Sequence, residues 1–187
     1  MARPGEIVNV ALTYADYCQL PNDGRRYEVL DGELAVTPAP TPFHQEVVVN
    51  LLRVLDDHVR TQRLGKLYVA PIDVVLAPTT VVQPDLVFVP TERLSAISGR
   101  GIEGPPDLVV EVLSPTTEAQ DRGAKLQLYL RFGVPHYWLI DPESRRLESY
   151  ERTASGYRLI AALERSAAFA PTIFPGLAVQ LDALWPQ

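Results

Sequence analysis

Two acidic residues stand where the surrounding sequence is apolar. Asp85 interrupts the run Val81–Val89, and Glu111 interrupts the run Asp107–Leu113. An ionised carboxylate inside a buried strand costs on the order of several kcal/mol unless a cation or several hydrogen bonds compensate it. Because a hard divalent cation prefers oxygen ligands and commonly needs only one or two carboxylates, we expect Mg²⁺ or Mn²⁺ at this pair.

The same pattern has a second interpretation that involves no metal. Both carboxylates can lie at strand ends, where they face solvent or pair with an arginine. Asp107 illustrates this case, since it follows Pro105-Pro106 and is expected to be a strand-entry residue. The metal interpretation makes a different prediction about stability. If Asp85 and Glu111 are two poorly solvated charges that recruit a cation, removing either should leave the free energy of unfolding nearly unchanged in metal-free buffer.

Lys125 and His44 are the further candidates. The only lysines are Lys66 and Lys125. A lysine on a helix that follows Glu111 can lay its stem on apolar surface and present its ammonium group to the carboxylates. The alternative is a helix lysine in solvent. His44 falls on the core-facing stripe of a predicted helix and can touch the site, or it is a buried or capping histidine; Asp73 ranks below both, because the pattern leaves its strand face open.

The elements that must position these residues follow an α/β order. Three strands rich in Val, Leu or Ile should be neighbours in the middle of one mixed sheet, because both of their faces are largely apolar, and they carry Asp73, Asp85 and Glu111. Helices should cover both faces. The expected elements are a short helix Tyr14–Leu20, a hairpin Tyr27–Leu30 and Glu33–Val36 around Asp31-Gly32, a helix from an N-cap at Thr41 to about Arg60, the strands Leu67–Ala77, Val81–Val89 and Asp107–Leu113, a helix from a capping box at Thr117 to Gly133, the strand Val134–Asp141, and a C-terminal antiparallel extension of Leu147–Glu151 with Tyr157–Ala162.

Length and composition limit the classes of protein that fit. A chain of 187 residues suits one globular domain, residues 1–187. The net charge of -6 argues against a broadly basic nucleic-acid binder, although it allows a local basic cleft. The sequence has neither the roughly 18 consecutive apolar residues that span a bilayer nor the apolar start of a secretory signal. We therefore expect a cytoplasmic protein with no membrane partner.

The ordered set of motifs resembles the PD-(D/E)XK nuclease superfamily, and within it a small family of proposed restriction endonucleases catalogued as a domain of unknown function. Pro84-Asp85 resembles the PD element. Glu111-Val112-Leu113 resembles the (D/E)XK element, with leucine where the lysine should stand. The likeness covers roughly residues 10 to 180 and extends to Tyr27–Leu34, His44, Pro106–Pro115, Asp121, Lys125 and Tyr137–Pro142.

This resemblance implies a restriction-endonuclease-like fold and metal-assisted hydrolysis of a phosphodiester. Asp85, Glu111 and the backbone carbonyl of Val112 would hold the Mg²⁺. Lys125 would take the place of the lysine missing at Leu113 and would orient water or stabilise developing negative charge. The implied substrate is nucleic acid, with DNA expected, and cutting both strands with one site per chain would suit a homodimer.

Two other functions remain open at this stage. A non-catalytic interaction module that keeps the nuclease fold would agree with the acidic composition and with the lack of an evident DNA-reading element. A metal hydrolase acting on a small phosphorylated molecule would instead need a narrow pocket lined by arginines. Metal binding separates the first of these alternatives from an endonuclease.

Overall fold

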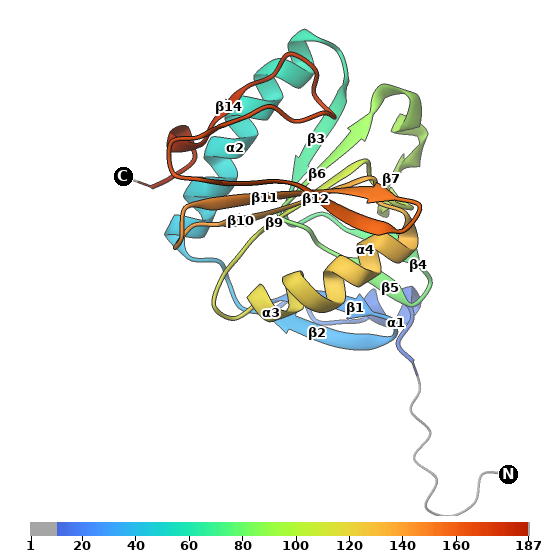
Figure 1. Ribbon diagram of the computed structural model, residues 1–187. Coiled ribbons are helices and arrows are strands. Elements are labelled where there is room, and N and C mark those ends of the chain that lie inside the picture. The colour runs from blue at the N-terminus through green and yellow to red at the C-terminus, as the bar shows by residue number, and fades with distance from the viewer. Residues whose placement is uncertain (1–10, 187) are drawn as a thin grey trace, which may run out of the picture.

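Two six-stranded sheets dominate the computed structural model, which describes residues 11–186 (Figure 1). The hairpin sheet has the order β2-β1-β5-β4-β8-β7, and the central sheet has the order β12-β11-β10-β9-β6-β3. The strands of the hairpin sheet are β1 (Arg26–Leu30), β2 (Glu33–Thr37), β4 (Val74–Ala77), β5 (Thr80–Val82), β7 (Ile97–Ser98) and β8 (Gly101–Glu103). Those of the central sheet are β3 (Gly65–Val69), β6 (Leu86–Pro90), β9 (Leu108–Val112), β10 (His136–Asp141), β11 (Arg146–Thr153) and β12 (Gly156–Glu164), and β13 (Ala168–Phe169) pairs with β14 (Val179–Gln180). The predicted mixed α/β class is confirmed.

Helices connect and cover these sheets. The long helix α2 begins where the sequence predicts, because the Thr41 side chain accepts a hydrogen bond from the His44 N–H at 3.2 Å and Pro42 occupies the first turn. The helical segments are α1 (Tyr14–Tyr17), α2 (Pro42–Thr61), the 3₁₀ turn η1 (Thr91–Ala96), α3 (Glu118–Gln120), the π-helical turn η2 (Asp121–Lys125), α4 (Leu126–Phe132) and the 3₁₀ turn η3 (Leu181–Ala183).

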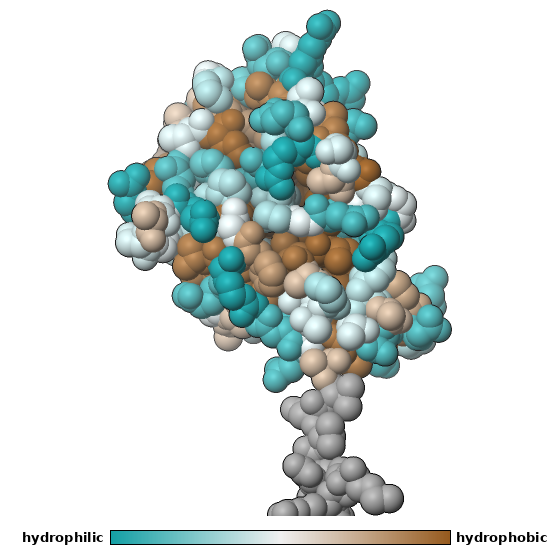
Figure 2. Space-filling view, turned by 90° about the vertical axis from the view of Figure 1, so that its right-hand side faces the viewer, coloured by the Kyte–Doolittle hydropathy of each residue, from teal (hydrophilic) through white to brown (hydrophobic). Residues whose placement is uncertain are grey.

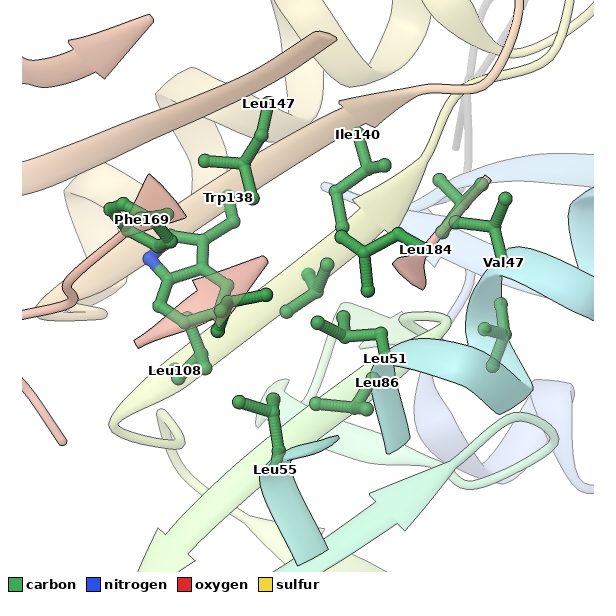
Figure 3. Packing of buried hydrophobic residues seen from close by; sticks show 14 of the residues in the cluster. Val47, Leu51, Leu55, Leu86, Leu108, Trp138, Ile140, Leu147, Phe169 and Leu184 are labelled. Carbon is green, nitrogen blue, oxygen red and sulfur yellow. The ribbon is translucent and has the colours of Figure 1, made fainter. Parts of the chain in front are cut away.

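The inner strands of the central sheet, such as β6 and β9, are buried on both faces. One face packs against α2 and the C-terminal segment, where Leu51 and Leu55 of α2 contact the strand residues Leu86 and Leu108 beside Trp138 (Figure 3). The other face packs against α4 and against the hairpin sheet, which lies beyond α4 in Figure 1. This double cover explains why the central strands are apolar on both faces, as the sequence predicts.

Two of the predicted strands are wrong in their extent. The run 67–77 divides into β3 and β4 around Pro71, and the run 81–89 divides into β5 and β6 around Pro84. In both cases the two pieces pair in different sheets. Proline lacks the amide hydrogen that a continuing strand needs, so each run ends at its proline. Asp73 consequently precedes a strand of the hairpin sheet and is not a neighbour of the strands that carry Asp85 and Glu111.

The predicted turns are confirmed, whereas one predicted cap is wrong. Asp31 and Gly32 have φ values of 53° and 87°, as a two-residue hairpin turn requires, and Gly133 ends α4 at φ 84°. Thr117 makes no side-chain capping hydrogen bond, and its segment begins as the short helix α3. The helix predicted from Thr117 to Gly133 is therefore interrupted by the turn η2.

The surface mixes hydrophobic and hydrophilic residues. Figure 2 shows, on the face that lies at the right-hand side of Figure 1, hydrophobic side chains gathered in a band between more hydrophilic regions. Such mixing is usual for a folded domain, because polar residues are too few to cover it. Within residues 11–186, no helix combines the length and the apolar character that a bilayer crossing requires.

Candidate active site

The register of the central sheet brings Asp85 and Glu111 together. β6 and β9 are antiparallel, with Leu86 opposite Val110, so extending this register by one residue places Asp85 opposite Glu111. Asp85 is 3% exposed and Glu111 is 1% exposed. The N–H of Val112 donates a hydrogen bond to Asp85 Oδ2 at 2.8 Å. The two carboxylates that the sequence singles out are thus buried neighbours on one face of the sheet.

Asp85 is compensated by side chains of the protein. Arg26 Nη1 lies 2.8 Å from its Oδ1, and His44 Nε2 lies 3.1 Å from its Oδ2. Although burial raises the pKa of Asp85, the hydrogen bond and charge of His44 and the charge of Arg26 together lower this pKa to about 2. Asp85 is therefore ionised at neutral pH, and the second interpretation, pairing with an arginine, is the one observed for this residue.

Lys125 reaches the site from the turn η2, which precedes α4. Its Nζ lies 3.0 Å from Glu111 Oε1, and the Tyr129 hydroxyl donates to the same oxygen at 2.8 Å. Lys125 is buried, so the expected approach to Glu111 is confirmed and the alternative of a lysine in solvent is wrong. Burial raises the pKa of Glu111 to about 8, because the opposing charge of Lys125 is offset by neighbouring carboxylates such as Asp121 and Asp85.

Two further carboxylates contact Lys125, and the residue pattern around them does not indicate this on chemical grounds. Glu28 Oε1 lies 3.0 Å from Nζ, and Asp121 Oδ1 lies 3.6 Å from it. Glu28 is fully buried on β1, where it also accepts the Gln83 N–H at 2.7 Å. A polar residue in a hairpin strand usually faces solvent, so alternation alone gave no signal that Glu28 points inward.

The turn η2 explains how two residues of one segment reach the same carboxylate cluster. Asp121 and Lys125 are its first and last residues, and both are buried. A π turn widens the helix locally, and such turns occur frequently at functional sites. Burial raises the pKa of Asp121 against the opposing charge of Lys125. We attribute the position of the Lys125 ammonium group to this turn, together with the helix α4 that continues it.

The cluster contains more acidic groups than fixed cations. Two strongly basic side chains, Arg26 and Lys125, face four carboxylates, which are Glu28, Asp85, Glu111 and Asp121. Glu28 Oε2 and Asp121 Oδ1 are buried with no hydrogen-bond partner among the residues that the structure describes. The excess of acidic groups over fixed cations, and the two acceptor atoms without a hydrogen bond, make the cluster suited to a divalent cation.

The individual oxygens also leave room for a cation. Both donors to Glu111 converge on Oε1, so Oε2 keeps its lone pairs. The N–H and C=O of one strand residue point to the same edge, and since the Val112 N–H reaches Asp85, the Val112 carbonyl faces that edge too. Within residues 11–186 no three His, Cys, Asp or Glu side chains are arranged as metal ligands. A cation here would therefore need backbone or water oxygens besides the two carboxylates.

The remaining acidic candidates lie outside this cluster. Asp73 accepts the Tyr17 hydroxyl at 2.6 Å and the Gln83 side-chain amide at 2.8 Å. Asp107 precedes β9 and pairs with Arg93 at 2.6 Å, so it is the strand-entry residue that the sequence predicts. Neither contacts Lys125 or Asp85.

Three adjoining cavities pass along the site. The largest, about 570 Å³, shares Arg26 and the segment 38–40 with a second cavity of about 200 Å³. The second shares His44 and the segment 114–115 with a third cavity of about 470 Å³. Since Arg26 and His44 are the side-chain partners of Asp85, the chain of cavities passes beside the carboxylate cluster, although none of the four carboxylates lines these cavities.

The chain is similar to known proteins over most of its length. A family model described as "Uma2: Putative restriction endonuclease" matches residues 14–183. The structure of a protein from Anabaena variabilis, described as a putative nuclease, superposes with a TM-score of 0.77 at 19% identity, covering 92% of this chain and 97% of that one. An uncharacterized protein of Synechocystis is 42% identical over 62 residues, which is 33% of this chain and 33% of that protein's length. The structural likeness shows a shared fold.

Proposed function

Because the chain belongs to the Uma2 family of putative restriction endonucleases, we propose that it hydrolyses phosphodiester bonds in nucleic acid, with DNA as the substrate and a divalent cation as the cofactor. The observation that carries this proposal is the buried cluster in which Lys125 contacts Glu111 while Asp85 lies opposite Glu111 on the neighbouring strand. A nuclease of this superfamily needs two carboxylates and one ammonium group together, and the cluster provides them.

Asp85, Glu111 and the carbonyl of Val112 would hold Mg²⁺ or Mn²⁺. When bound, the cation supplies Lewis-acid polarisation of the phosphorus centre and lowers the pKa of an attacking water. Asp85 is suited to this role because it stays ionised, and its Oδ1 has a single hydrogen-bond partner in Arg26. Glu111 offers Oε2, which neither Lys125 nor Tyr129 occupies.

Lys125 is the residue that would orient the attacking water and stabilise the negative charge that develops on the phosphate. Burial lowers the pKa of Lys125, but the negative charges of Glu111, Glu28 and Asp121 raise it by a larger amount. The net pKa is therefore raised, and the ammonium group keeps its proton. A permanently charged group favours electrostatic stabilisation over general-base catalysis. This position supports the view that Lys125 replaces the motif lysine absent at Leu113.

Arg26 and His44 are positioned to bind the phosphate on the solvent side of Asp85. Arg26 lines two of the cavities and its side chain is 17% exposed, so its guanidinium group could also donate to an anionic oxygen there. His44 Nε2 must carry a proton, because an ionised carboxylate only accepts hydrogen bonds. His44 thereby keeps Asp85 oriented while the adjoining cavities remain open to a strand.

The adjoining cavities favour a polymer over a small phosphorylated molecule. Their combined path extends from the α1 side of the hairpin sheet, past Arg26 and His44, to the segment around Arg145. A nucleotide strand has the length and the regularly spaced phosphates to use such a path. We further propose that two copies act together when both strands of a duplex are cut, since each chain has one such cluster.

The decisive experiment is a cleavage series on supercoiled plasmid and on labelled oligonucleotides with Mg²⁺, Mn²⁺ or chelator. We expect cleavage only with metal, and loss of cleavage in Glu111→Gln. The matched control is Glu103→Gln, because Glu103 lies on the exposed side of β8. Binding of DNA without cleavage under any metal would instead identify a non-catalytic module. Hydrolysis restricted to small phosphate esters would identify a metal hydrolase that acts on small phosphorylated molecules.

A further inference from the structure

The largest cavity lies beside the carboxylate cluster and is not part of it. Arg26 separates the two, since it lines the cavity and also bonds Asp85. Gln83 also connects them, because its side chain lines the cavity while its backbone N–H bonds Glu28. A ligand group in this cavity would therefore share Arg26 with the carboxylate cluster.

The polar wall of the cavity has a defined hydrogen-bonding character. Gln83 Nε2 donates to Asp73 Oδ1 at 2.8 Å and lies 3.0 Å from the Tyr17 hydroxyl, which itself donates to Asp73. Because a carboxylate only accepts, these contacts fix the amide with its nitrogen toward Asp73. Gln83 Oε1 is buried and has no partner among residues 11–186, so it does not face the open cavity. The acceptor on this wall is the Asp73 carboxylate, whose Oδ2 accepts no hydrogen bond from the same residues. This wall is suited to a ligand that brings N–H donors.

The rest of the cavity lining is largely apolar. The Tyr17 and Tyr27 rings line the cavity together with proline rings of the segments 38–40 and 71, and Arg25 lies at its solvent side. Aromatic rings and an arginine beside a polar hydrogen-bonding wall form the usual environment of an unstacked nucleobase. The volume of about 570 Å³ is in the range of a small-molecule site and does not accommodate a stretch of duplex.

We propose that this cavity is a nucleobase subsite that takes one unpaired base carrying an exocyclic amino group, next to the phosphodiester bonds held at Arg26. The proposal rests on the proposed function, because it assigns a substrate feature to the same site. The amino group would donate to the Asp73 carboxylate, while the ring stacks on a tyrosine. A base can reach this cavity only after leaving its stack, so single-stranded or locally melted substrate is favoured.

The test measures binding in the presence of a chelator, so that it does not depend on cleavage. The probes are fluorescently labelled single-stranded DNA and RNA oligonucleotides that differ at one central position, which is adenine, cytosine, guanine, thymine or uracil, or an abasic residue. This position is flanked by abasic residues, so that no neighbouring base can take the cavity. We expect the abasic oligonucleotide to bind roughly tenfold more weakly than the oligonucleotides with amino-bearing bases, as stacking and hydrogen bonds predict. Thymine and uracil should bind with intermediate affinity.

Three variants and one control identify the wall responsible. Asp73→Asn should weaken the preference for amino-bearing bases, and Asp57→Asn, at an exposed position of α2, should leave it unchanged. Ala39→Trp fills the cavity from an exposed position and avoids the buried network, so it tests the site even if Asp73→Asn unfolds; it should abolish the base dependence. Arg25→Gln should weaken binding of every oligonucleotide equally, because a phosphate contact carries no base information.

The outcomes separate the two proposals. Base-dependent binding without cleavage in any metal would support the subsite and overturn the nuclease proposal. Metal-dependent cleavage with equal affinity for abasic and amino-bearing oligonucleotides would overturn the subsite and keep the nuclease. Base dependence that survives in Ala39→Trp would also overturn the subsite. Failure to bind any oligonucleotide would overturn both.

Discussion

Lys125 Nζ lies 3.0 Å from Glu111 Oε1, across a separation of 14 residues in the chain. Glu111 belongs to a strand in the middle of the central sheet, and Lys125 ends the turn η2 on the helical segment that follows. Because the position after Val112 is Leu113 and not lysine, the ammonium group comes from a different element than the motif would supply. The proposed activity therefore depends on a residue outside the sheet, and Lys125 can be replaced without changing any strand.

Replacing Lys125 should separate catalysis from binding. We expect Lys125→Met to lower the cleavage rate by about 10²–10³-fold, the usual effect of removing one group that stabilises the transition state. Lys125→Met should also lower the melting temperature, because Glu28, Glu111 and Asp121 lose their shared cation. The control is Lys66→Met, since Lys66 is exposed on β3. Equal cleavage rates for the two variants would remove Lys125 from the mechanism.

Removing the Asp85 carboxylate should destabilise the protein. The sequence alone favours nearly unchanged stability, on the premise that Asp85 waits for a metal, but the carboxylate is bonded by Arg26, His44 and the Val112 N–H. Asp85→Ala leaves these three donors unpaired and should cost about 1–3 kcal/mol in the free energy of unfolding. Urea denaturation with chelator measures this cost. Asp56→Ala, which breaks an exposed pair with Arg60, is the control and should cost less than about 1 kcal/mol.

If Asp85→Ala were as stable as wild type in chelator, the contacts of Asp85 with Arg26 and His44 would contribute little to stability. The interpretation in which Asp85 waits for a metal would then be supported. Adding Mg²⁺ gives a second readout. Wild type should gain about 2.7 kcal/mol of stability when the cation is at one hundred times its dissociation constant, and the variant should gain far less.

The end of α4 offers a test of the fold around Lys125. Gly133 has φ 84°, and a Cβ there would meet Arg152 Cζ only at the ordinary distance of 3.9 Å. The cost of Gly133→Ala therefore comes from the left-handed backbone and should be about 1–2 kcal/mol. Gly99→Ala is the control, because Gly99 has open space and no positive φ. Similar melting temperatures for the two variants would mean that the cap contributes nothing.

Local signals predicted much of the fold. The Asp31-Gly32 turn, the Thr41 cap and the glycine at the end of α4 are each determined by a few neighbouring residues, and all three are observed. The pair of Asp85 and Glu111 was also predictable, because a carboxylate in an apolar strand requires an explanation. These features depend on residue type and spacing alone.

The remaining features depend on contacts between distant elements. The division into two sheets follows from Pro71 and Pro84, which the apolar pattern around them concealed. The turn η2 has no distinctive sequence, and its geometry appears only when Asp121 and Lys125 both turn inward. The pattern around Glu28 predicts only a hairpin residue. Nothing near it in the sequence indicates that α4 and the central sheet cover the face of the hairpin on which Glu28 lies.

Glu28 therefore provides the last prediction. Glu28→Gln keeps an oxygen that accepts the Gln83 N–H but removes one of the three carboxylates that contact Lys125. Because the cluster then has less excess negative charge, the Mg²⁺ concentration at half-maximal cleavage should rise roughly tenfold, as with other residues that support metal ligands. The maximal rate at saturating Mg²⁺ should be nearly that of wild type. Glu111→Gln, by contrast, should lose cleavage at every Mg²⁺ concentration.

The control for Glu28→Gln is Glu33→Gln, which lies in the same hairpin on the exposed strand β2 and should leave the Mg²⁺ dependence unchanged. The measurement is the initial cleavage rate as a function of Mg²⁺, with melting curves for each variant. An unchanged Mg²⁺ midpoint together with a lower melting temperature would assign Glu28 to the fold alone. A loss of activity that saturating Mg²⁺ does not restore would instead place Glu28 among the catalytic groups, because its charge would then act on the transition state and not on cation affinity.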